Sequence, residues 1–270
     1  MRKHMSTVLL ILILVTGVSL LLYPTISDYW NSIFQSKAIA TYTEEVARID
    51  DNVYETLWGN ARDYNATLVR SDERFVLYEE EKLAYERLLN VAGNGVMGYI
   101  QIPAINCSLP VYHGTSEEVL QIAIGHIEGS SLPVGGEGSH CVLSGHRGLP
   151  RAKLFTELDK LREGDVFMLQ VLDETLTYEV DKIWIVEPHE IEKLGIEEGK
   201  DYCTLVTCTP YGVNSHRLLV RGTRVENRDV GTVARVSADA VQIDPVLVAP
   251  LVSVPIFLIF LCWVFIRYRK

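Results

Sequence analysis

Three side chains of this chain combine a thiol, an imidazole and a guanidinium. The apolar run from Thr204 to Cys208 ends on a thiol rather than on a turn residue, and Arg217 stands nine residues later in the next apolar run. A third run, Cys141 to Leu143, leads into His146, which precedes Cys208 by sixty-two residues. At the ends of three strands, these groups could act as nucleophile, acid/base and holder of a negative oxygen.

The chemistry that this set could perform is acyl transfer. Ordinary pKa values of about 8.5 for Cys and about 6.5 for His make the thiolate–imidazolium pair about a hundredfold rarer than the neutral pair, a cost of about 2.7 kcal/mol. A guanidinium favours the thiolate but disfavours the imidazolium, so its clearer role is to bind the oxyanion of a tetrahedral intermediate. The imidazole would protonate the departing amine and later deprotonate the incoming nucleophile.

Each of these residues also has a structural interpretation. A Cys at a strand end is more often structural than catalytic, and Arg217 could be an edge-strand charge. His140, Cys141 and His146 could together bind a metal, although no second Cys stands at the usual structural-zinc spacing, so we expect neither metal nor cofactor. Five other histidines compete with His146, namely His113, His126, His140, His189 and His216.

The elements that must position these groups are short strands. From Gly98 onward, apolar runs are separated by Gly, Pro and Asn, which is typical of a sandwich or barrel. A helix is expected at Lys153 to Leu161, after the Gly148-Leu149-Pro150 turn. The predicted strands are 99–102, 141–143, 166–169, 177–180, 182–186, 202–208 and 217–225.

The region from Thr25 to Asn90 is predicted to be helical with interruptions. Apolar side chains recur at near-helical spacing among many charges in Ser36 to Leu57 and in Glu79 to Leu89, as in amphipathic surface helices.

Both ends of the chain are predicted to span a membrane. Val8 to Tyr23 is apolar, has a positive flank and lacks an Ala-x-Ala-like cleavage site, which favours an uncleaved signal anchor over a removed signal peptide. Val246 to Ile266 is uncharged and about long enough to cross a bilayer. The positive clusters lie at the two chain ends, so both termini are predicted to be cytoplasmic and the region between the spans extracellular.

The region between the two spans is acidic. The chain of 270 residues has a formal net charge of −10, and without the five terminal Lys and Arg residues this region carries about −15, which argues against a nucleic-acid partner.

Five cysteines do not define a disulfide framework here, because the count is odd and Cys262 falls in a predicted span. Sequence alone cannot pair Cys107, Cys141, Cys203 and Cys208. Cys203 and Cys208 are five residues apart, so in a continuous strand they face opposite sides, and Cys203 is expected to be a buried small apolar residue.

The run from Thr204 to Cys208 resembles the TLxTC signature of sortases, the membrane-anchored cysteine transpeptidases of Gram-positive bacteria. The segments 130–138, 144–150 and 209–217 resemble class C, the pilin-polymerising sortases. The resemblance runs from about Asn94 to Val225, and two membrane anchors also fit that class.

The resemblance implies a mainly β protein with an eight-stranded sortase barrel, N-terminal helices and a transmembrane helix at each end. It implies Cys208 as nucleophile, His146 as acid/base and Arg217 as stabilising cation. Leu205, Thr207 and Thr209, which flank the thiol, become candidate substrate-binding residues. An LPxTG-like signal would be cleaved between Thr and Gly, and the pilin would be passed from a thioacyl-enzyme to a lysine of the next pilin.

One departure from class C concerns its N-terminal lid, in which an Asp-Pro-aromatic tripeptide plugs the site. This chain has no such tripeptide, and the nearest approximation is Asp72-Glu73-Arg74-Phe75, which makes Asp72 and Phe75 candidate lid residues. Without Pro the loop is less rigid and could continue as helix. A modified lid and no lid both remain open.

The predicted organisation is a membrane anchor at 1–24, a helical region at 25–92, a catalytic barrel at 93–227, a linker at 228–245, a span at 246–266 and a basic tail at 267–270. The main alternative function is attachment of proteins to a peptidoglycan amine of the cell wall. The second alternative function is that of a non-enzymatic, membrane-tethered barrel that binds surface proteins.

Overall fold

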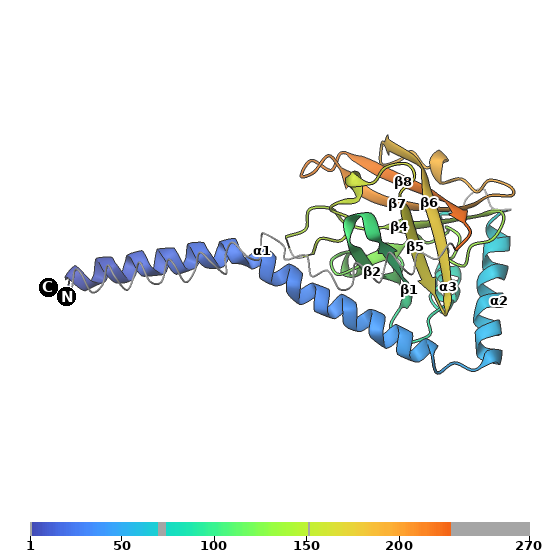
Figure 1. Cartoon of the computed structure of the whole chain (residues 1–270), viewed down its shortest axis with the longest axis horizontal. Coiled ribbons are helices and arrows are strands. Elements are labelled where there is room, and N and C mark those ends of the chain that lie inside the picture. The colour runs from blue at the N-terminus through green and yellow to red at the C-terminus, as the bar shows by residue number, and fades with distance from the viewer. Residues whose placement is uncertain (1, 70–73, 151, 228–270) are drawn as a thin grey trace. The chain divides into compact units, whose positions relative to one another are not determined.

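The protein is a barrel preceded by helices (Figure 1), and the computed structural model describes residues 2–69, 74–150 and 152–227. The body considered below runs from Trp30 to Arg228, whereas the chain up to Tyr29 belongs to a separate unit. The helices are α1 (Arg2–Val46), α2 (Asp51–Leu68), α3 (Glu79–Tyr85) and α4 (Glu117–Leu120), with 3-10 turns η1 (Pro103–Ile105), η2 (Leu158–Lys160) and η3 (Glu192–Leu194). The strands are β1 (Val96–Ile102), β2 (Cys107–His113), β3 (Ile124–His126), β4 (Ser139–Ser144), β5 (Val166–Val171), β6 (Glu174–Val186), β7 (Asp201–Thr209) and β8 (His216–Val225).

The eight strands close into a barrel in the order β1-β2-β3-β4-β7-β8-β6-β5, which confirms the predicted fold. The pairs β2–β3 and β4–β7 are parallel, and the remaining pairs are antiparallel. Closure leaves no free sheet edge, so each strand is held on both sides. The two strands predicted at 177–180 and 182–186 form one strand, β6, with a register shift between Val180 and Lys182.

Residues 25–92 are mainly helical, as predicted, but the individual helices begin and end at other residues than the sequence pattern indicates. The predicted helix from Ser36 to Leu57 is divided between α1 and α2, and Asp50 caps α2 by accepting a hydrogen bond from the N–H of Val53 at 2.9 Å. The helix predicted at Lys153 to Leu161 is wrong. Leu154 has a φ of 38°, outside the helical region, and only the 3-10 turn η2 forms there.

Polar side chains fasten the helices to the barrel at buried positions. The Tyr42 hydroxyl of α1 donates to Met97 O at 3.1 Å and accepts from Leu172 N–H at 2.7 Å. The Asn65 amide of α2 donates to Leu132 O at 3.1 Å and accepts from Leu132 N–H at 2.7 Å. These contacts satisfy backbone groups that water cannot reach, so the helices complete the barrel rather than merely cover it.

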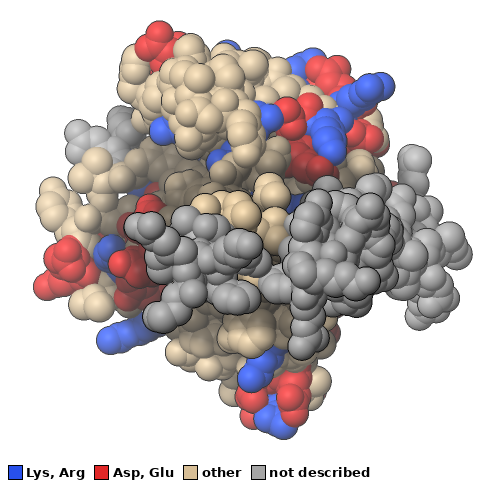
Figure 2. Space-filling view, turned by 90° about the vertical axis from the view of Figure 1, so that its left-hand side faces the viewer, with Lys and Arg blue, Asp and Glu red and all other residues tan. Residues whose placement is uncertain are grey.

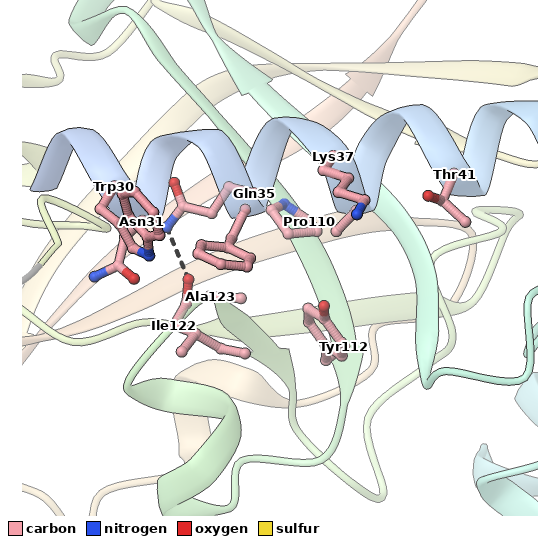
Figure 3. Close-up of a pocket in the computed structure, with 11 residues that line it drawn as sticks. Trp30, Asn31, Gln35, Lys37, Thr41, Pro110, Tyr112, Ile122 and Ala123 are labelled. Atoms are coloured by element: carbon pink, nitrogen blue, oxygen red, sulfur yellow. Dashed lines mark hydrogen bonds between the residues drawn. The ribbon is translucent and has the colours of Figure 1, made fainter. Parts of the chain in front are cut away.

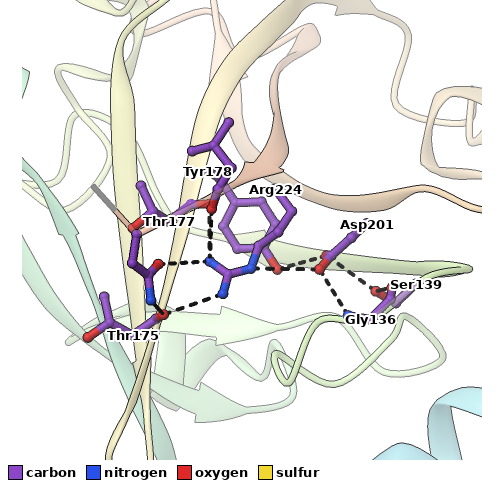
Figure 4. A network of polar contacts seen from close by, with 9 residues as sticks. Gly136, Ser139, Thr175, Thr177, Tyr178, Asp201 and Arg224 are labelled. Carbon is purple, nitrogen blue, oxygen red and sulfur yellow. Dashed lines mark hydrogen bonds and ion pairs between the residues drawn. The ribbon is translucent and has the colours of Figure 1, made fainter. Parts of the chain in front are cut away.

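A polar network joins the beginning of β7 to its neighbours (Figure 4). Asp201 accepts hydrogen bonds from the Gly136 N–H at 2.9 Å and from the Tyr178 hydroxyl at 3.0 Å, and lies 3.9 Å from Arg224 Nε. Burial raises the pKa of the Asp201 carboxyl, whereas these donors and Arg224 oppose that rise. The network therefore ties β6, β7 and β8 together at one end of the barrel.

The segment Leu10–Val46 of α1 is long and apolar enough to cross a membrane, and it is the candidate span among the described residues. Several of its apolar side chains are exposed, including Leu20 and Leu21. By its length and composition it could serve as an anchor or as a signal sequence. The predicted linker, C-terminal span and basic tail lie outside the described residues.

On the face shown in Figure 2, acidic and basic side chains are interspersed.

The docking of α2 depends on Asn65. We expect Asn65→Ala to lower the free energy of unfolding by about 2 kcal/mol, because two buried backbone groups of Leu132 lose their partner. Chemical denaturation of the detergent-solubilised chain, followed by tryptophan fluorescence, would measure this. Asn52→Ala, on the exposed face of the same helix, should change stability by less than about 0.5 kcal/mol. Equal stabilities of the two variants would contradict this role.

Candidate active site

The register of three strands brings the predicted nucleophile, acid/base and cation together. Cys208 of β7 is paired directly with Arg217 of β8. On the other side, the parallel pairing of β4 and β7 reaches Ser144 opposite Val206, and the Gly145 N–H donates to Val206 O at 3.0 Å. The Thr207 hydroxyl donates to Gly145 O at 2.7 Å. Continued by two residues, this register would put His146 level with Cys208.

All three side chains are partly exposed. Arg217 donates from Nη1 to Asn214 O at 3.2 Å and to His216 O at 3.1 Å, which holds it over the β7–β8 turn. The Nε2 atom of His146 lies 3.7 Å from Glu117 Oε2 on α4. Glu117 was not identified from the sequence, because only the folded barrel brings α4 to the end of β4.

Gly145 has a steric role directly before His146. A Cβ atom at this position would lie 2.8 Å from Ile124 Cγ2 and 2.8 Å from Phe155 Cδ2. These contacts are too close for any side chain, so glycine lets the backbone before His146 lie tightly against the barrel.

The three candidate substrate-binding residues lie behind the reactive face of β7. Leu205 is completely buried in the barrel core, and Thr207 and Thr209 are nearly so. Thr207 bonds to Gly145, and the Thr209 hydroxyl lies 3.4 Å from Arg147 Nη1. Side chains alternate along a strand, so residues 205, 207 and 209 face away from Cys208. Their contacts position the strand, and the structure does not bring them beside the thiol.

Two of the other described cysteines, Cys203 and Cys107, are poor nucleophiles, and the third, Cys141, is buried, although hydrogen bonds to Cys203 and His126 lower the pKa of its thiol. Cys203 is completely buried in the barrel core, as predicted, and is paired in register with the buried Cys141. Burial raises the pKa of Cys203 well above its ordinary value, and burial raises that of Cys107 to about 12. Neither thiol therefore forms a thiolate near neutral pH.

The rival histidines near the barrel are held in structural hydrogen bonds. His140 donates from Nδ1 to Gly195 O at 2.7 Å and accepts at Nε2 from the Thr204 hydroxyl at 2.7 Å. Burial lowers the pKa of His140 to about 4. The alternative metal site at His140, Cys141 and His146 is not assembled in the described part of the chain.

His113 and His126 also make buried or half-buried hydrogen bonds. His113 contacts Gly95 O at 2.9 Å and Leu88 O at 2.6 Å. His126 contacts the Tyr85 hydroxyl at 2.8 Å. The exposed His189 lies 3.6 Å from Glu187, and His216 contacts the Ser215 hydroxyl at 2.9 Å, so no rival shares the position of His146 beside the strand end.

The predicted lid stretch crosses the outer face of the same strands. Phe75 packs against an apolar cluster formed by Val142, Val186, Leu194, Val206 and Leu219. The Arg74 guanidinium lies 4.6 Å from the centre of the Phe75 ring and donates to Leu194 O. Val206 is two residues before Cys208 and on the same face, so Phe75 packs on the face of β7 that carries the thiol. Asp72 lies outside the described residues.

The path of this stretch requires glycine beneath it. Gly129 has a φ of 80°, and a Cβ atom there would lie 1.8 Å from Arg74 O. The close approach of the two backbones fixes where Arg74 and Phe75 cross the β3–β4 loop.

Two cavities border the barrel. One, of about 510 Å³, opens on the inner side of the strand ends and includes Thr209, Leu218, Arg147 and Tyr211 in its lining. The other, of about 560 Å³, lies between α1 and β2 (Figure 3), where Gln35 donates to Ile122 O at 2.7 Å. The first adjoins the predicted site, whereas the second belongs to the docking of α1.

Comparisons with known proteins agree with this geometry. A family model for the sortase domain matches residues 100–225. The chain is 32% identical over 131 residues to sortase D of Bacillus subtilis (strain 168), a match that covers 47% of this chain and 63% of that relative. The chain thus spans less than two thirds of the length of this curated relative.

Two solved structures resemble most of the described body. Sortase C1 of Streptococcus agalactiae shares 52% identity with a TM-score of 0.69, covering 71% of this chain and 100% of that chain. Sortase C of Clostridium perfringens, solved with the C-terminal cell wall sorting motif, shares 45% identity with a TM-score of 0.63 and covers 71% and 99%.

The buried His140 should make stability depend on pH. Its pKa is about 4 in the folded protein and near 6.5 when unfolded, so the unfolded state binds more protons between these values. Its contribution is complete above pH 6.5 and is lost as the pH falls to about 4, by roughly 3 kcal/mol. In denaturation curves from pH 7 to pH 4, His140→Gln should lose less stability than the wild type.

The exposed His189 supplies the control for this measurement. His189→Gln should keep the wild-type pH dependence. Parallel stability curves for the wild type and His140→Gln would show that His140 does not carry the effect.

Proposed function

The chain belongs to the sortase family of cysteine transpeptidases, and from this premise we propose that it is a membrane-anchored transpeptidase that polymerises pilins. The observation that carries the proposal is the alignment of Cys208 with Arg217 on one side and with the backbone leading to His146 on the other. The high identity to sortase C structures supports class C in particular.

In the proposed first step, the Cys208 thiolate attacks the Thr carbonyl carbon of an LPxTG-like sorting signal. The carbonyl oxygen becomes an oxyanion, which the Arg217 guanidinium stabilises. Arg217 makes both of its hydrogen bonds to the β7–β8 turn through Nη1, which leaves the other N–H groups of the guanidinium for the oxyanion. When the Thr–Gly bond breaks, His146 gives its proton to the departing amine and a thioester remains on Cys208.

In the proposed second step, a lysine amine of another pilin attacks the thioester. His146 takes a proton from this amine, the C–S bond breaks, and the thiolate of Cys208 is regenerated with an isopeptide bond as product. The proposed partners are therefore LPxTG-bearing pilins as acyl donors and lysine-bearing pilins as acceptors. Cell-wall attachment differs only in the acceptor, which would be a peptidoglycan amine.

The proposed setting is the outer surface of the cell membrane. The apolar segment of α1 would anchor the chain, a second span would follow the barrel at 246–266, and both termini would be cytoplasmic. The catalytic barrel of residues 93–227 then faces the outside, where pilins are displayed. The proposed enzyme uses no metal or cofactor.

We further propose that Arg74 and Phe75 form a modified lid. Phe75 packs over Val206 on the reactive face, and Arg74 binds Leu194 O in the β6–β7 loop. Cation–π contact between the two side chains adds rigidity that Pro supplies in other class C lids. The segment would have to move before a sorting signal could reach the thiol.

The central test is the acyl intermediate. Incubation with an LPxTG peptide should add the mass of the acyl fragment to a Cys208-containing peptide, as measured by mass spectrometry after acid quenching. Cys208→Ala should form no adduct, because the other described thiols are protonated or buried, whereas Cys107→Ala should still form it. An adduct on Cys208→Ala would refute the proposed nucleophile.

The acceptor is identified by competition in the same assay. A purified pilin and lipid II are offered together to the thioacyl-enzyme, and the linked product is identified. An isopeptide bond to the pilin lysine is the expected result. A product linked only to lipid II would replace pilin polymerisation by cell-wall attachment.

The lid is tested by thiol labelling. Phe75→Ala should speed alkylation of Cys208 by iodoacetamide about tenfold or more, because the aromatic ring no longer covers the approach. Val76→Ala, which alters an exposed neighbour, should leave the rate unchanged. If Phe75→Ala is labelled at the wild-type rate, the segment does not act as a lid.

A further inference from the structure

The carboxylate of Glu117 lies against the ring of His146. Oε2 of Glu117 and Nε2 of His146 are 3.7 Å apart, and the two side chains come from α4 and from the segment after β4. This is an ionic rather than a hydrogen-bonding distance in the resting protein. The carboxylate would attract the ring most strongly when the imidazole carries a positive charge.

The fold sets the position of Glu117. Ser116 caps α4 by accepting a hydrogen bond from Val119 N–H at 3.5 Å, and α4 leads directly into β3. The loop before it passes close to β3, because a Cβ atom at Gly125 would lie 2.0 Å from Gly114 O. These contacts fix the place of the Glu117 backbone in the fold, and the 3.7 Å contact with His146 is made by its side chain.

The identity of the contacted nitrogen matters for the chemistry. Glu117 contacts Nε2, so in the role proposed below Nδ1 would be the ring nitrogen that exchanges a proton with the Cys208 thiol. When that proton moves from Sγ to Nδ1, an imidazolium forms next to the carboxylate. The other charged groups near the ring are Cys208 on β7 and Arg217 on β8, with Arg147 paired to Asp159.

We propose that Glu117 is a positioning residue for His146: it orients the ring and stabilises the imidazolium that accompanies the reactive Cys208 thiolate. This role rests on the proposed transpeptidase function and adds a fourth residue to its site. The Glu117 carboxylate offsets part of the free-energy cost of forming the thiolate–imidazolium pair of Cys208 and His146. It also opposes the effect of Arg217, whose positive charge repels a charged imidazole.

The size of the effect follows from distance and exposure. The Glu117 side chain is 68% exposed, so water screens the pair strongly. One charge pair near 4 Å in water corresponds to about a fivefold change in an equilibrium constant. We therefore expect Glu117→Gln to lower the population of the reactive pair about fivefold.

The experiment measures alkylation of Cys208 by iodoacetamide from pH 5 to pH 10 in the full chain, quantified on the Cys208 peptide by mass spectrometry. Glu117→Gln should react about fivefold more slowly than the wild type at pH 6, where reactivity depends on the imidazolium. At pH 10, which is above the ordinary pKa of a thiol, the two rates should agree. Equal rates at every pH, or an equal loss at every pH, would overturn the proposal.

Two further variants separate this role from a general disturbance of α4. Glu118→Gln removes the neighbouring carboxylate, which faces Ser116 and its own backbone, and should behave as the wild type. In a His146→Ala background, Glu117→Gln should have no effect, because the group through which it acts is missing. A further loss in that background would assign Glu117 a role independent of His146.

The assay needs no sorting signal, so it distinguishes this proposal from the proposed function. If the chain forms no acyl intermediate but shows the predicted alkylation profile, the Glu117 role stands and the transpeptidase function fails. If the acyl intermediate forms at the wild-type rate in Glu117→Gln at pH 6, the Glu117 role fails and the function stands.

Discussion

The register between β4, β7 and β8 is the constraint on which the rest of the site depends. β7 pairs with β4 in parallel and with β8 in antiparallel orientation, so the chain leaving β4 runs beside the end of β7 while β8 enters from its other side. This arrangement pairs Cys208 with Arg217 and leads the chain that carries His146 along the end of β7. A shift of one residue would turn Thr207 outward and bury the thiol of Cys208 in the barrel.

The same three strands are fixed at their opposite end by a different kind of interaction. Ser139 begins β4 opposite Asp201 at the beginning of β7, and Arg224 near the end of β8 approaches the same carboxylate. Hydrogen bonds around Asp201 thus set the strands at one end (Figure 4), and the bond from Thr207 to Gly145 sets them at the other. Because both ends are held, the reactive side chains inherit a fixed spacing from the sheet.

Sequence predicts the parts of this protein that depend on local pattern. Apolar runs such as those in 202–208 and 217–225 identify their strands, but β3 has only three residues, Ile124 to His126, and gives no such signal. Alternation correctly placed Cys203 away from Cys208, and the same parity argues against Leu205, Thr207 and Thr209 as substrate contacts. The failure at 153–161 reflects the positive φ of Leu154, and Glu117 could not be found because tertiary folding alone brings α4 to His146.

The β6–β7 loop beside the reactive face is held by two successive carbonyls that have different partners. Arg74 binds Leu194 O, and His140 binds Gly195 O at 2.7 Å. Arg74 belongs to the segment that carries Phe75, whereas His140 belongs to the barrel. Displacement of Phe75 would therefore remove the contact of Arg74 with Leu194 O and leave that of His140 with Gly195 O, so the loop would stay attached to β4 while its outer side becomes free.

Burial keeps the His140 ring neutral. Its Nε2 atom then accepts a hydrogen bond from Thr204, and its Nδ1 atom donates one to the loop. In the proposed lid movement, the hydrogen bond between the barrel and this loop would therefore be kept.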